Sequence, residues 1–574
     1  MKEFNKNTKF IWSYLKKQKK ELIIYIITNI IYIGISILVP IISARQIIYL
    51  TDSKFDQLIM ISVVIFFVEI CRNIINYFAA KSCQVMYRET FIRLQNDLGK
   101  SILKLENRVV DNNSSGVFIQ RLTGDTSKIS DFYNMFIGMS TEIITDIGIF
   151  GALFIINKYI CLYLVFTLLF VYYLENTRSK IYNDRDKKFR KENEKISGFV
   201  GEMVRGVRDI KMLNSEDSFL NSLYEKTKNL NEKKYEMAST NRKYRLVIGN
   251  SKDIFNLLLV MLLIMLVGRE VLAVANAIVV YNYSSRVSSL TYQLSYLIDG
   301  IKDFNLSSTR VSEIIDSENY KKEVFGSIHI DKVNGDFEFK DVYFKYDKKN
   351  VLKGLSFKVN ANETVGFVGK SGAGKSTIFS LLCKMYDVNK GEILIDGINI
   401  EDLDKDSIRG NITIISQNPY IFNMSIKENL KIVKNDVSDK EIKEACKIAC
   451  LDKFINSLPD KYDTIVGEGG ITLSGGQKQR LAIARALVQK TEIILFDEAT
   501  SALDNETQEE IKKAIANMKG EYTILIIAHR LTTVMDSDKI FVIDDGKVVG
   551  TGTHEKLLKT NNIYKQIYAK ELEK

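Results

Sequence analysis

The sequence is poor in the residues that build disulfide frameworks and histidine metal centres. Its 574 residues include 6 cysteines, 3 histidines, 3 prolines and 1 tryptophan. The cysteines are scattered without a CxxC pair, which argues against a disulfide scaffold, and with only three histidines we expect no histidine-based metal site. Cys446 and Cys450 are four residues apart in a predicted helix, and we interpret both as ordinary helix-face residues.

The sequence also does not gather its excess basic charge in one block or stripe, although its formal net charge is +10. A basic balance can indicate a nucleic-acid partner. Here much of the excess lysine and arginine lies between long apolar runs in the first half of the chain. We therefore expect no nucleic-acid partner and turn to those apolar runs.

Six apolar stretches are long enough, some with help from their flanks, to cross a bilayer, which takes about twenty residues in a helix. The first is too long for a cleaved secretory signal and has no small-x-small site after it, so it is predicted to be retained. The six predicted spans of an α-helical transmembrane domain are Leu22–Ile42, Leu58–Ala79, Ile137–Ile156, Tyr159–Leu174, Ile254–Val267 and Leu272–Tyr296.

The charge of the connecting segments predicts the orientation. Lysine and arginine are abundant before the first span and in the segments Lys81–Lys128 and Arg178–Arg245, whereas the alternate loops are short and carry few charges. The positive-inside rule then places both termini in the cytoplasm of a multi-pass protein in the lipid bilayer of the cell membrane. The two long inner segments are polar and helix-forming, so we expect them to continue the spans as helices.

The pattern changes after Asp316. We expect a transmembrane domain over residues 1–316, a polar linker over 317–335 and a soluble α/β domain over 336–574. The opening of that domain, FEFKDVYFKY, alternates apolar and polar residues like a half-buried strand. The later runs TVGFVG, EIILFDEA and YTILIIAH are continuously apolar, as parallel strands buried on both faces are.

Ligands of such sheets bind beyond the carboxyl ends of the strands. The three apolar runs therefore bring Lys375, the pair Asp497–Glu498 and His529 to one edge. This convergence predicts a site at that edge before any motif is considered.

A phosphate-binding loop follows the first of these strands. In GKSGAGKST the glycines let the backbone wrap phosphate groups, Lys375 reaches the outer phosphates, and the Ser376 hydroxyl binds Mg²⁺. An accidental match is disfavoured because a buried strand precedes the motif and a helix follows it. The predicted nucleotide-binding residues of the loop are Gly369, Lys370, Ser371, Gly372, Ala373, Gly374, Lys375, Ser376 and Thr377.

Four further side chains complete the predicted catalytic group. Asp497 is placed to hold Mg²⁺, and Glu498 to orient an attacking water or accept its proton. The alternative for Glu498 is a cap of the next turn, and for His529 a buried core histidine. Gln417, in SQNP, can bind metal or water through its amide.

A second candidate phosphate site occurs at LSGGQKQR, Leu473–Arg480. A serine and two glycines open onto a helix-forming run, so bare N–H groups and the positive end of a helix dipole face outward. One chain with one nucleotide does not need two such cradles.

The ordered motifs GKSGAGKST, SQNP, LSGGQ, IILFDEATSALD and AHR resemble those of an ATP-binding cassette. With six preceding spans, the chain resembles the half-transporter exporters of that family. The resemblance implies that two cassettes meet head to tail, with ATP and Mg²⁺ between the phosphate loop of one and the LSGGQ of the other. Ser474, Gly475, Gly476 and Gln477 would then contact nucleotide held by a second subunit.

The resemblance implies further roles. Tyr346 would stack on adenine, and Asp504 would lie across the dimer interface. The segments ENRVVDNNSSGVFIQRLTGDTSKI and GEMVRGVRDIKMLNSE resemble the two inner loops, whose short coupling helices rest on a cassette, the second on that of the partner. The outer turn at Arg269 and Glu270 is shorter than is usual in the family.

Some charged residues lie within the predicted spans. Glu69 and Arg72 are three apart and can pair, Glu142 and Asp146 lie one turn apart, and Arg286 is on the sixth span. Such residues are costly at membrane depth and usually face the bundle interior or a cavity. An interhelical network that holds the bundle together is the favoured interpretation, and contact with a charged or amphipathic substrate is the alternative.

The sequence thus predicts an ATP-driven exporter of a small hydrophobic or amphipathic substrate such as a drug, lipid or peptide. It would work by alternating access as a homodimer or heterodimer, in a bacterial cell membrane. The alternatives are an exporter-fold importer of a chelated metal and a non-pumping regulator or channel. A soluble mechanical ATPase of the DNA-repair type conflicts with the six apolar stretches.

Overall fold

The computed structural model describes residues 2–316, 319–346, 349–467, 470–497, 505–528 and 530–572. The chain separates into two compact units. The membrane unit comprises Met1–Lys104 and Asn113–Tyr320, and the cassette unit comprises Leu105–Asn112 and Lys321–Lys574. Eight residues of the first inner loop therefore pack with the cassette.

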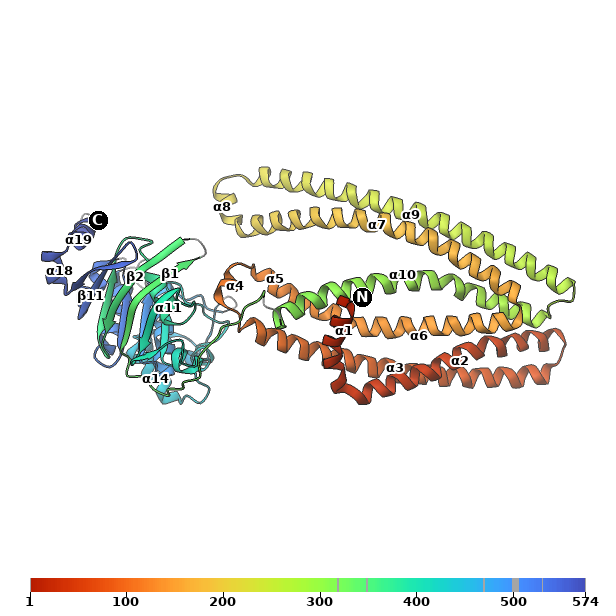
Figure 1. Cartoon of the computed structure of the whole chain (residues 1–574), viewed down its shortest axis with the longest axis horizontal. Helices are drawn as coiled ribbons and strands as arrows, with labels where there is room; N and C mark the ends of the chain where they lie inside the picture. The colour runs from red at the N-terminus through yellow and green to blue at the C-terminus, as the bar shows by residue number, and fades with distance from the viewer. Residues whose placement is uncertain are drawn as a thin grey trace. The chain divides into compact units, whose positions relative to one another are not determined.

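The membrane unit is built from long helices (Figure 1). Six of them carry the predicted spans: α2 (Lys19–Thr51), α3 (Phe55–Ile102), α6 (Thr126–Ile156), α7 (Lys158–Arg205), α9 (Glu216–Gly268) and α10 (Val274–Asp316). Shorter elements are α1 (Lys2–Leu15), the 3₁₀ turn η1 (Lys16–Gln18), α5 (Ser115–Gln120), the π-helical turn η2 (Arg121–Asp125) and α8 (Val207–Met212).

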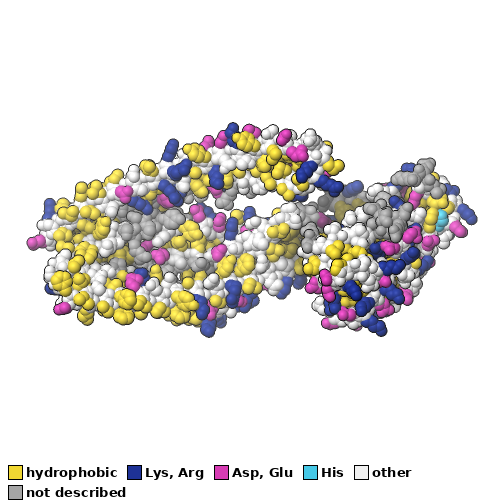
Figure 2. Space-filling view, turned by 180° about the vertical axis from the view of Figure 1, so that it is seen from behind, with side chains coloured by type: hydrophobic (Ala, Val, Ile, Leu, Met, Phe, Trp, Pro, Cys, Tyr) yellow, Lys and Arg dark blue, Asp and Glu magenta, His cyan; other side chains and the backbone are white. Residues whose placement is uncertain are grey.

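Among the described residues, five helical stretches are long and apolar enough to cross a membrane; they contain the first five predicted spans. The sixth prediction falls on the start of α10, where several side chains lie outside the description, and it stays a prediction. Figure 2 shows hydrophobic side chains spread over the surface of the membrane unit, as lipid-facing helices require.

The helices of the inner loops extend well beyond the apolar stretches. Helices α3 and α7 have 48 residues each and α9 has 53. At 1.5 Å per residue these are roughly 70–80 Å long, more than twice the hydrocarbon thickness of about 30 Å. The prediction that the inner loops continue the spans as helices is confirmed.

The cassette unit contains a six-stranded sheet in the order β12-β11-β3-β10-β9-β6. All neighbours pair in parallel except β11 and β12. The three predicted buried strands are neighbours in it, and β3 and β10 are buried throughout. Its strands are β3 (Thr364–Val368), β6 (Ile412–Ile415), β9 (Ile493–Asp497), β10 (Thr523–Ile527), β11 (Lys539–Asp544) and β12 (Lys547–Gly552).

An antiparallel sheet, in the order β2-β1-β4-β5, lies beside this core. It contains β1 (Phe337–Tyr346), β2 (Lys349–Val359), β4 (Lys390–Ile395) and β5 (Ile398–Asn399), and β1 is the strand predicted from FEFKDVYFKY. Phe337 and Phe339 of β1 are fully buried with Phe367 of β3, so one hydrophobic cluster joins the two sheets.

Helices cover the sheets, and a short two-stranded ribbon, β7 (Met424–Ser425) with β8 (Ile465–Val466), precedes the LSGGQ segment. The helices are α4 (Asn107–Asp111), α11 (Lys375–Leu382), α12 (Lys405–Arg409), α13 (Ile426–Lys431), α14 (Asp439–Ile448), α15 (Asp452–Ser457), α16 (Gly475–Gln489), α17 (Asn505–Met518), α18 (His554–Thr560) and α19 (Asn562–Leu572).

The helix-face interpretation of the two neighbouring cysteines is half right. Cys446 is a buried residue of α14. The helix ends at Ile448, however, and Cys450 lies beyond it with a left-handed φ of 55°. Cys450 is therefore a residue of the turn after the helix.

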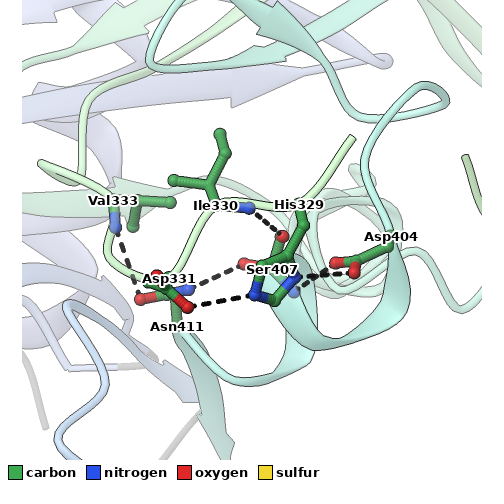
Figure 3. Close-up of polar contacts among 7 residues, drawn as sticks. All are labelled: His329, Ile330, Asp331, Val333, Asp404, Ser407 and Asn411. Carbon is green, nitrogen blue, oxygen red and sulfur yellow. Dashed lines mark hydrogen bonds and ion pairs between the residues drawn. The ribbon is translucent and has the colours of Figure 1, made fainter. Parts of the chain in front are cut away.

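The second part of the polar linker is fastened to the cassette by hydrogen bonds (Figure 3). His329 Nδ1 lies 2.7 Å from Asp404 Oδ2, and its Nε2 lies 3.0 Å from Asp331 Oδ1. The backbone N–H of Ile330 donates to Ser407 Oγ over 2.7 Å. The hydrogen bonds to Asp404 and Asp331 raise the pKa of His329.

Candidate functional site

The phosphate loop runs from the end of β3 to the first turn of α11. Gly372 and Gly374 have φ values of 80° and 102°, which L side chains rarely adopt. Lys375 begins α11 and is only 7 % exposed. Its Nζ donates to the carbonyls of Gly369 over 2.9 Å and of Lys370 over 3.1 Å, so the loop curls around the ammonium group.

The nine predicted loop residues therefore occupy one tight turn and the amino end of a helix. The first N–H groups of a helix have no intrahelical acceptor and carry partial positive charge. Together with Lys375 they form an anion cradle suited to phosphate groups.

A hydroxyl and a carboxylate meet beside this cradle. Ser376 Oγ donates to Asp497 Oδ1 over 3.0 Å. Asp497 is the last residue of β9, which is separated from β3 only by β10. Hard oxygen donors of this kind fit Mg²⁺, which is typically held by one or two protein oxygens plus phosphate.

Gln417 lies just beyond β6, the neighbour of β9 at the sheet edge. Its carbonyl accepts a hydrogen bond from Gln479 Nε2 over 3.1 Å, which connects this loop to α16. The structure therefore brings Lys375, Asp497 and Gln417 to the carboxyl edge of one sheet. Glu498, Asp504 and His529 lie outside the described residues, and their roles stay predictions.

Tyr346 ends β1 and is 36 % exposed. Its ring lies 5.2 Å from the ring of Tyr386 at an interplanar angle of 87°, and 4.8 Å from Phe344 at 89°. These edge-on contacts orient an aromatic ring that remains partly open to solvent, as stacking on a base requires.

The LSGGQ segment is a reciprocal helix cap. Ser474 is the N-cap of α16, and its Oγ accepts from the N–H of Gln477 over 3.3 Å. Gln477 Oε1 in turn accepts from the N–H of Ser474 over 2.9 Å. Gly475 and Gly476 are the first two helical residues, so their N–H groups lack intrahelical acceptors; Gly475 is exposed and Gly476 is buried.

Each of these two helix ends has its own hydrogen bonds within the cassette. Among the described residues, no hydrogen bond joins 474–477 to the loop 369–377. Helix α16 is held instead by burial of its length and by the ion pair of Arg480 with Glu510. The cassette unit thus contains two helix amino ends whose N–H groups are suited to anions, and no hydrogen bond joins them in the part of the chain that the structure describes.

Sequence reasoning missed the docking of α4 at the Tyr346 end of β1. Arg108 donates to the carbonyl of Lys345 over 3.4 Å, and Asn107 Nδ2 donates to the carbonyl of Met385 over 3.3 Å. The hydroxyl of Tyr386 donates to Asp111 over 2.5 Å. Only the resemblance suggested a coupling helix here, and no sequence pattern singles out Tyr386.

In the membrane unit, the predicted pair of Glu69 and Arg72 is confirmed, with 2.5 Å between oxygen and nitrogen. Asp146 is 2 % exposed on α6 and Glu142 is partly buried. The side chain of Arg286 lies outside the described part of α10. Sequence reasoning also missed a cavity of about 340 Å³ between α7, α9 and α10, whose lining includes Tyr163, Thr167, Lys252, Asp253, Asn256 and Asn282.

Two family models match the chain. The ABC transporter transmembrane region matches residues 22–290, and the ABC transporter model matches residues 352–501. The match to a solved bacterial Atm1-family ABC exporter with ATP bound covers 97 % of this chain and 99 % of that one, with a TM-score of 0.82 and 23 % identity.

Several curated proteins are similar. A putative multidrug export ATP-binding/permease protein of Bacillus subtilis, YgaD, is 30 % identical over 97 % of each chain. A protein of the same description from Staphylococcus aureus is 31 % identical over 97 % of this chain and 98 % of that one. The ATP-dependent lipid A-core flippase of Haemophilus influenzae is 43 % identical over 45 % of this chain and 44 % of its own.

The phosphate loop, the capped LSGGQ helix, the membrane-spanning helices and these similarities lead to one conclusion: the chain belongs to the ABC transporters, as a multi-pass transport ATPase of the exporter fold with permease and cassette on one polypeptide.

Proposed function

We propose that two copies of this chain form an exporter, in which each ATP is held between the phosphate loop of one copy and the LSGGQ helix of the other. The observation that carries the proposal is that one cassette presents two helix amino ends, at Lys375 and at Gly475, whose N–H groups are suited to phosphate. A head-to-tail dimer gives the second end a phosphate to bind, because it brings the α16 of one copy to the loop of the other.

Within each nucleotide site the residues have different roles in binding ATP, holding Mg²⁺ and hydrolysis. The cradle and Lys375 hold the phosphates, and Tyr346 stacks on adenine. Ser376 and Asp497 hold Mg²⁺, which offsets the charge of the phosphates. Glu498 orients the attacking water or accepts its proton, Gln417 binds the metal or the water, and His529 belongs to the same catalytic group. Asp504 completes the interface between cassettes.

ATP drives the transport cycle because only the closed dimer makes both halves of each contact. Closure moves the inner-loop helices α4 and α8 with the cassettes and converts an inward-facing cavity into an outward-facing one. Hydrolysis then separates the cassettes. Both termini and the cassette lie on the cytoplasmic side, as the basic inner segments indicate.

The substrate we propose is hydrophobic or amphipathic. Relatives are described as multidrug exporters and as a lipid A-core flippase. The cavity between α7, α9 and α10 supports this class, because it combines the rings of Tyr163 and Tyr281 with the amides of Asn256 and Asn282. Polar groups at membrane depth are costly and typically serve a substrate path.

A complementation experiment tests the shared site. The variants Lys375→Ala and Ser474→Glu are each expected to fail to occlude nucleotide as homodimers. Co-expressed, they form heterodimers in which one site carries both defects and the other carries neither. We expect one occluded nucleotide per purified heterodimer after vanadate trapping. A heterodimer that occludes none would show that both groups act within one copy and would overturn the proposal.

A flux experiment tests direction. Inside-out vesicles with the unaltered protein should accumulate amphipathic drugs or lipids when ATP is added, and vesicles with Glu498→Gln should not. ATP-dependent loss of a chelated metal from preloaded vesicles would indicate an importer. An ATP-dependent current without accumulation would indicate a channel.

A further inference from the structure

The first helix of the chain has one face fixed against the membrane unit. Along α1 and η1 the residues Ile11, Tyr14, Leu15 and Gln18 are buried. Spacings of three and four place them on one side of a helix. Figure 1 shows α1 running across the long helices rather than along them.

Polar contacts fasten this face at three points. Asn7 Nδ2 donates to Thr309 Oγ1 on α10 over 3.0 Å. Tyr14 donates to Asp97 on α3 over 3.1 Å. Gln18 Nε2 donates to Thr90, also on α3, over 3.3 Å. The orientation of α1 is therefore set, and so is the identity of the face it leaves exposed.

The exposed face is basic. No aspartate or glutamate occurs between residues 4 and 20. None of the ion pairs in the described part of the chain involves the lysines of this face. Trp12, the single tryptophan of the sequence, lies among them and is 48 % exposed. The basic face of α1 and η1 consists of Lys6, Lys9, Trp12, Ser13, Lys16 and Lys17, and it continues onto Lys19 and Lys20, the first two residues of α2.

The basic face lies next to the start of the first apolar stretch, and this position indicates that it faces the membrane surface. Only Glu21 separates Lys20 from the apolar stretch that begins at Leu22, so the lysines stand at a membrane–water boundary. Tryptophan and lysine are the residues that anchor helices there: the indole enters the headgroup region, and the ammonium groups reach lipid phosphates. An acidic soluble protein would match the charge but not the exposed indole beside a membrane span.

We propose that the basic face of α1 and η1 binds the headgroups of anionic phospholipids in the leaflet next to the cassettes. The choice of leaflet rests on the proposed orientation, whereas the binding itself does not. Because Asn7 ties α1 to α10, the lipid charge fixes the position of a helix that ends at Asp316, just before the cassette linker.

The single tryptophan makes the proposal directly measurable. The full-length dimer is placed in nanodiscs of phosphatidylcholine, with or without about a third phosphatidylglycerol. In separate preparations, one of the two lipids carries brominated acyl chains, which quench nearby indole fluorescence. We expect brominated phosphatidylglycerol to quench Trp12 about fivefold more per lipid than brominated phosphatidylcholine, and added salt to reduce the difference.

Two matched variants assign the effect to the basic face. Lys9→Gln/Lys16→Gln removes two charges beside Trp12 and should abolish the preference for phosphatidylglycerol. Lys228→Gln/Lys234→Gln removes two exposed charges from α9 and should leave it intact. Equal ATP turnover of both variants in neutral nanodiscs shows that they fold.

Three results would overturn the proposal. Equal quenching by the two lipids would exclude recognition of anionic lipid. A preference that survives Lys9→Gln/Lys16→Gln would place the recognition elsewhere. A Trp12 spectrum that responds to added polyglutamate but to neither lipid would assign the face to an acidic protein. Both leaflets of a nanodisc are alike, so an error in orientation cannot produce any of these results, and labelling of Ser13→Cys in intact cells tests the orientation separately.

Discussion

The hydroxyl of Tyr386 donates a hydrogen bond of 2.5 Å to the carboxylate of Asp111, and so ties the first inner-loop helix to the cassette. The ring of Tyr386 meets the ring of Tyr346 edge-on. Burial, and then the bond to Asp111, raises the pKa of Tyr386, so its hydroxyl keeps its proton at physiological pH. One side chain therefore contacts both the proposed adenine platform and the inner loop.

Removing this hydroxyl should weaken coupling without weakening ATP binding. Tyr386→Phe keeps the ring beside Tyr346 but loses a bond to a charged acceptor. Since Asp111 is exposed, the loss is about 1 kcal/mol, or about fivefold in the ATP-driven closing equilibrium. Distances between spin labels at Met212 of the two copies measure closure, because Met212 is 77 % exposed on α8.

A matched control lies on the same strand. Tyr343 is an exposed tyrosine of β1 whose hydroxyl has no hydrogen-bond partner among the described residues. Tyr343→Phe should leave both ATP affinity and closure unchanged. If Tyr386→Phe closes as fully as this control at every ATP concentration, Tyr386 has no part in coupling.

The stabilisation of the cassette by the hydrogen bonds of His329 to Asp404 and Asp331 should depend on pH. Hydrogen bonds to Asp404 and then Asp331 raise the pKa of His329 above its ordinary value of 6.5. A group with a raised folded pKa stabilises fully below its unfolded pKa, and this contribution is lost as pH rises through the folded pKa. The Tm of the cassette should therefore fall as pH increases above 6.5.

The variant His329→Gln keeps hydrogen-bonding capacity but cannot be charged, and should remove this part of the pH dependence. Asp404 behaves in the opposite sense. Hydrogen bonds from Ser407 lower its pKa to about 2, so its contribution is present above pH 3.8 and is lost as pH falls through about 2. Identical pH profiles of Tm for the unaltered protein and His329→Gln would show that the charge of His329 does not stabilise the cassette.

The sheet core and the phosphate loop were predictable because local patterns encode them. The strands β3, β9 and β10 are continuous apolar runs, and a strand buried on both faces needs such a run. Their parallel pairing brings the hydroxyl of Ser376 to Asp497, although the two residues are 121 positions apart. The motif identifies the loop, and the topology supplies the partner.

Other features were not predictable, for physical reasons. The bond between Asp111 and Tyr386 joins residues 275 positions apart, and neither lies in a periodic pattern that marks a contact. The end of α14 depends on the left-handed turn at Cys450, which no glycine signals in the sequence. The capping of α16 was also missed, because Gln477 was interpreted only as part of a phosphate-binding signature.

Substitutions of two glycines of the phosphate loop, Gly372 and Gly374, distinguish the cost of backbone strain from the cost of steric crowding. Both have positive φ, which costs roughly 1–2 kcal/mol for an L side chain. A Cβ at Gly372 would have no atom within 4 Å, whereas one at Gly374 would lie 2.8 Å from Leu352 Cδ2. Gly374→Ala should thus lower Tm and ATP affinity more than Gly372→Ala. Equal losses in thermal unfolding and nucleotide titration would show that strain alone matters.

A substitution at Gln477 can distinguish its role in capping α16 from its proposed contact with nucleotide. A glutamate occupies the same position in the capping box of another helix of this cassette. In α13, Glu428 accepts from the N–H of Ser425 over 2.9 Å, and the N–H of Glu428 donates to Ser425 Oγ over 3.1 Å. Gln477→Glu should therefore preserve the cap of α16, and its negative charge at a helix amino terminus is favourable for stability.

The same charge would face the phosphate of the partner's nucleotide in the proposed dimer. We expect Gln477→Glu to keep the Tm of the unaltered protein while ATP hydrolysis falls at least tenfold, since like charges repel strongly in a closed site. Gln477→Ala should instead lower stability more than hydrolysis, because loss of the cap costs about 0.5–1 kcal/mol of the free energy of unfolding. Full hydrolysis by a stable Gln477→Glu protein would mean that the α16 end does not contact nucleotide.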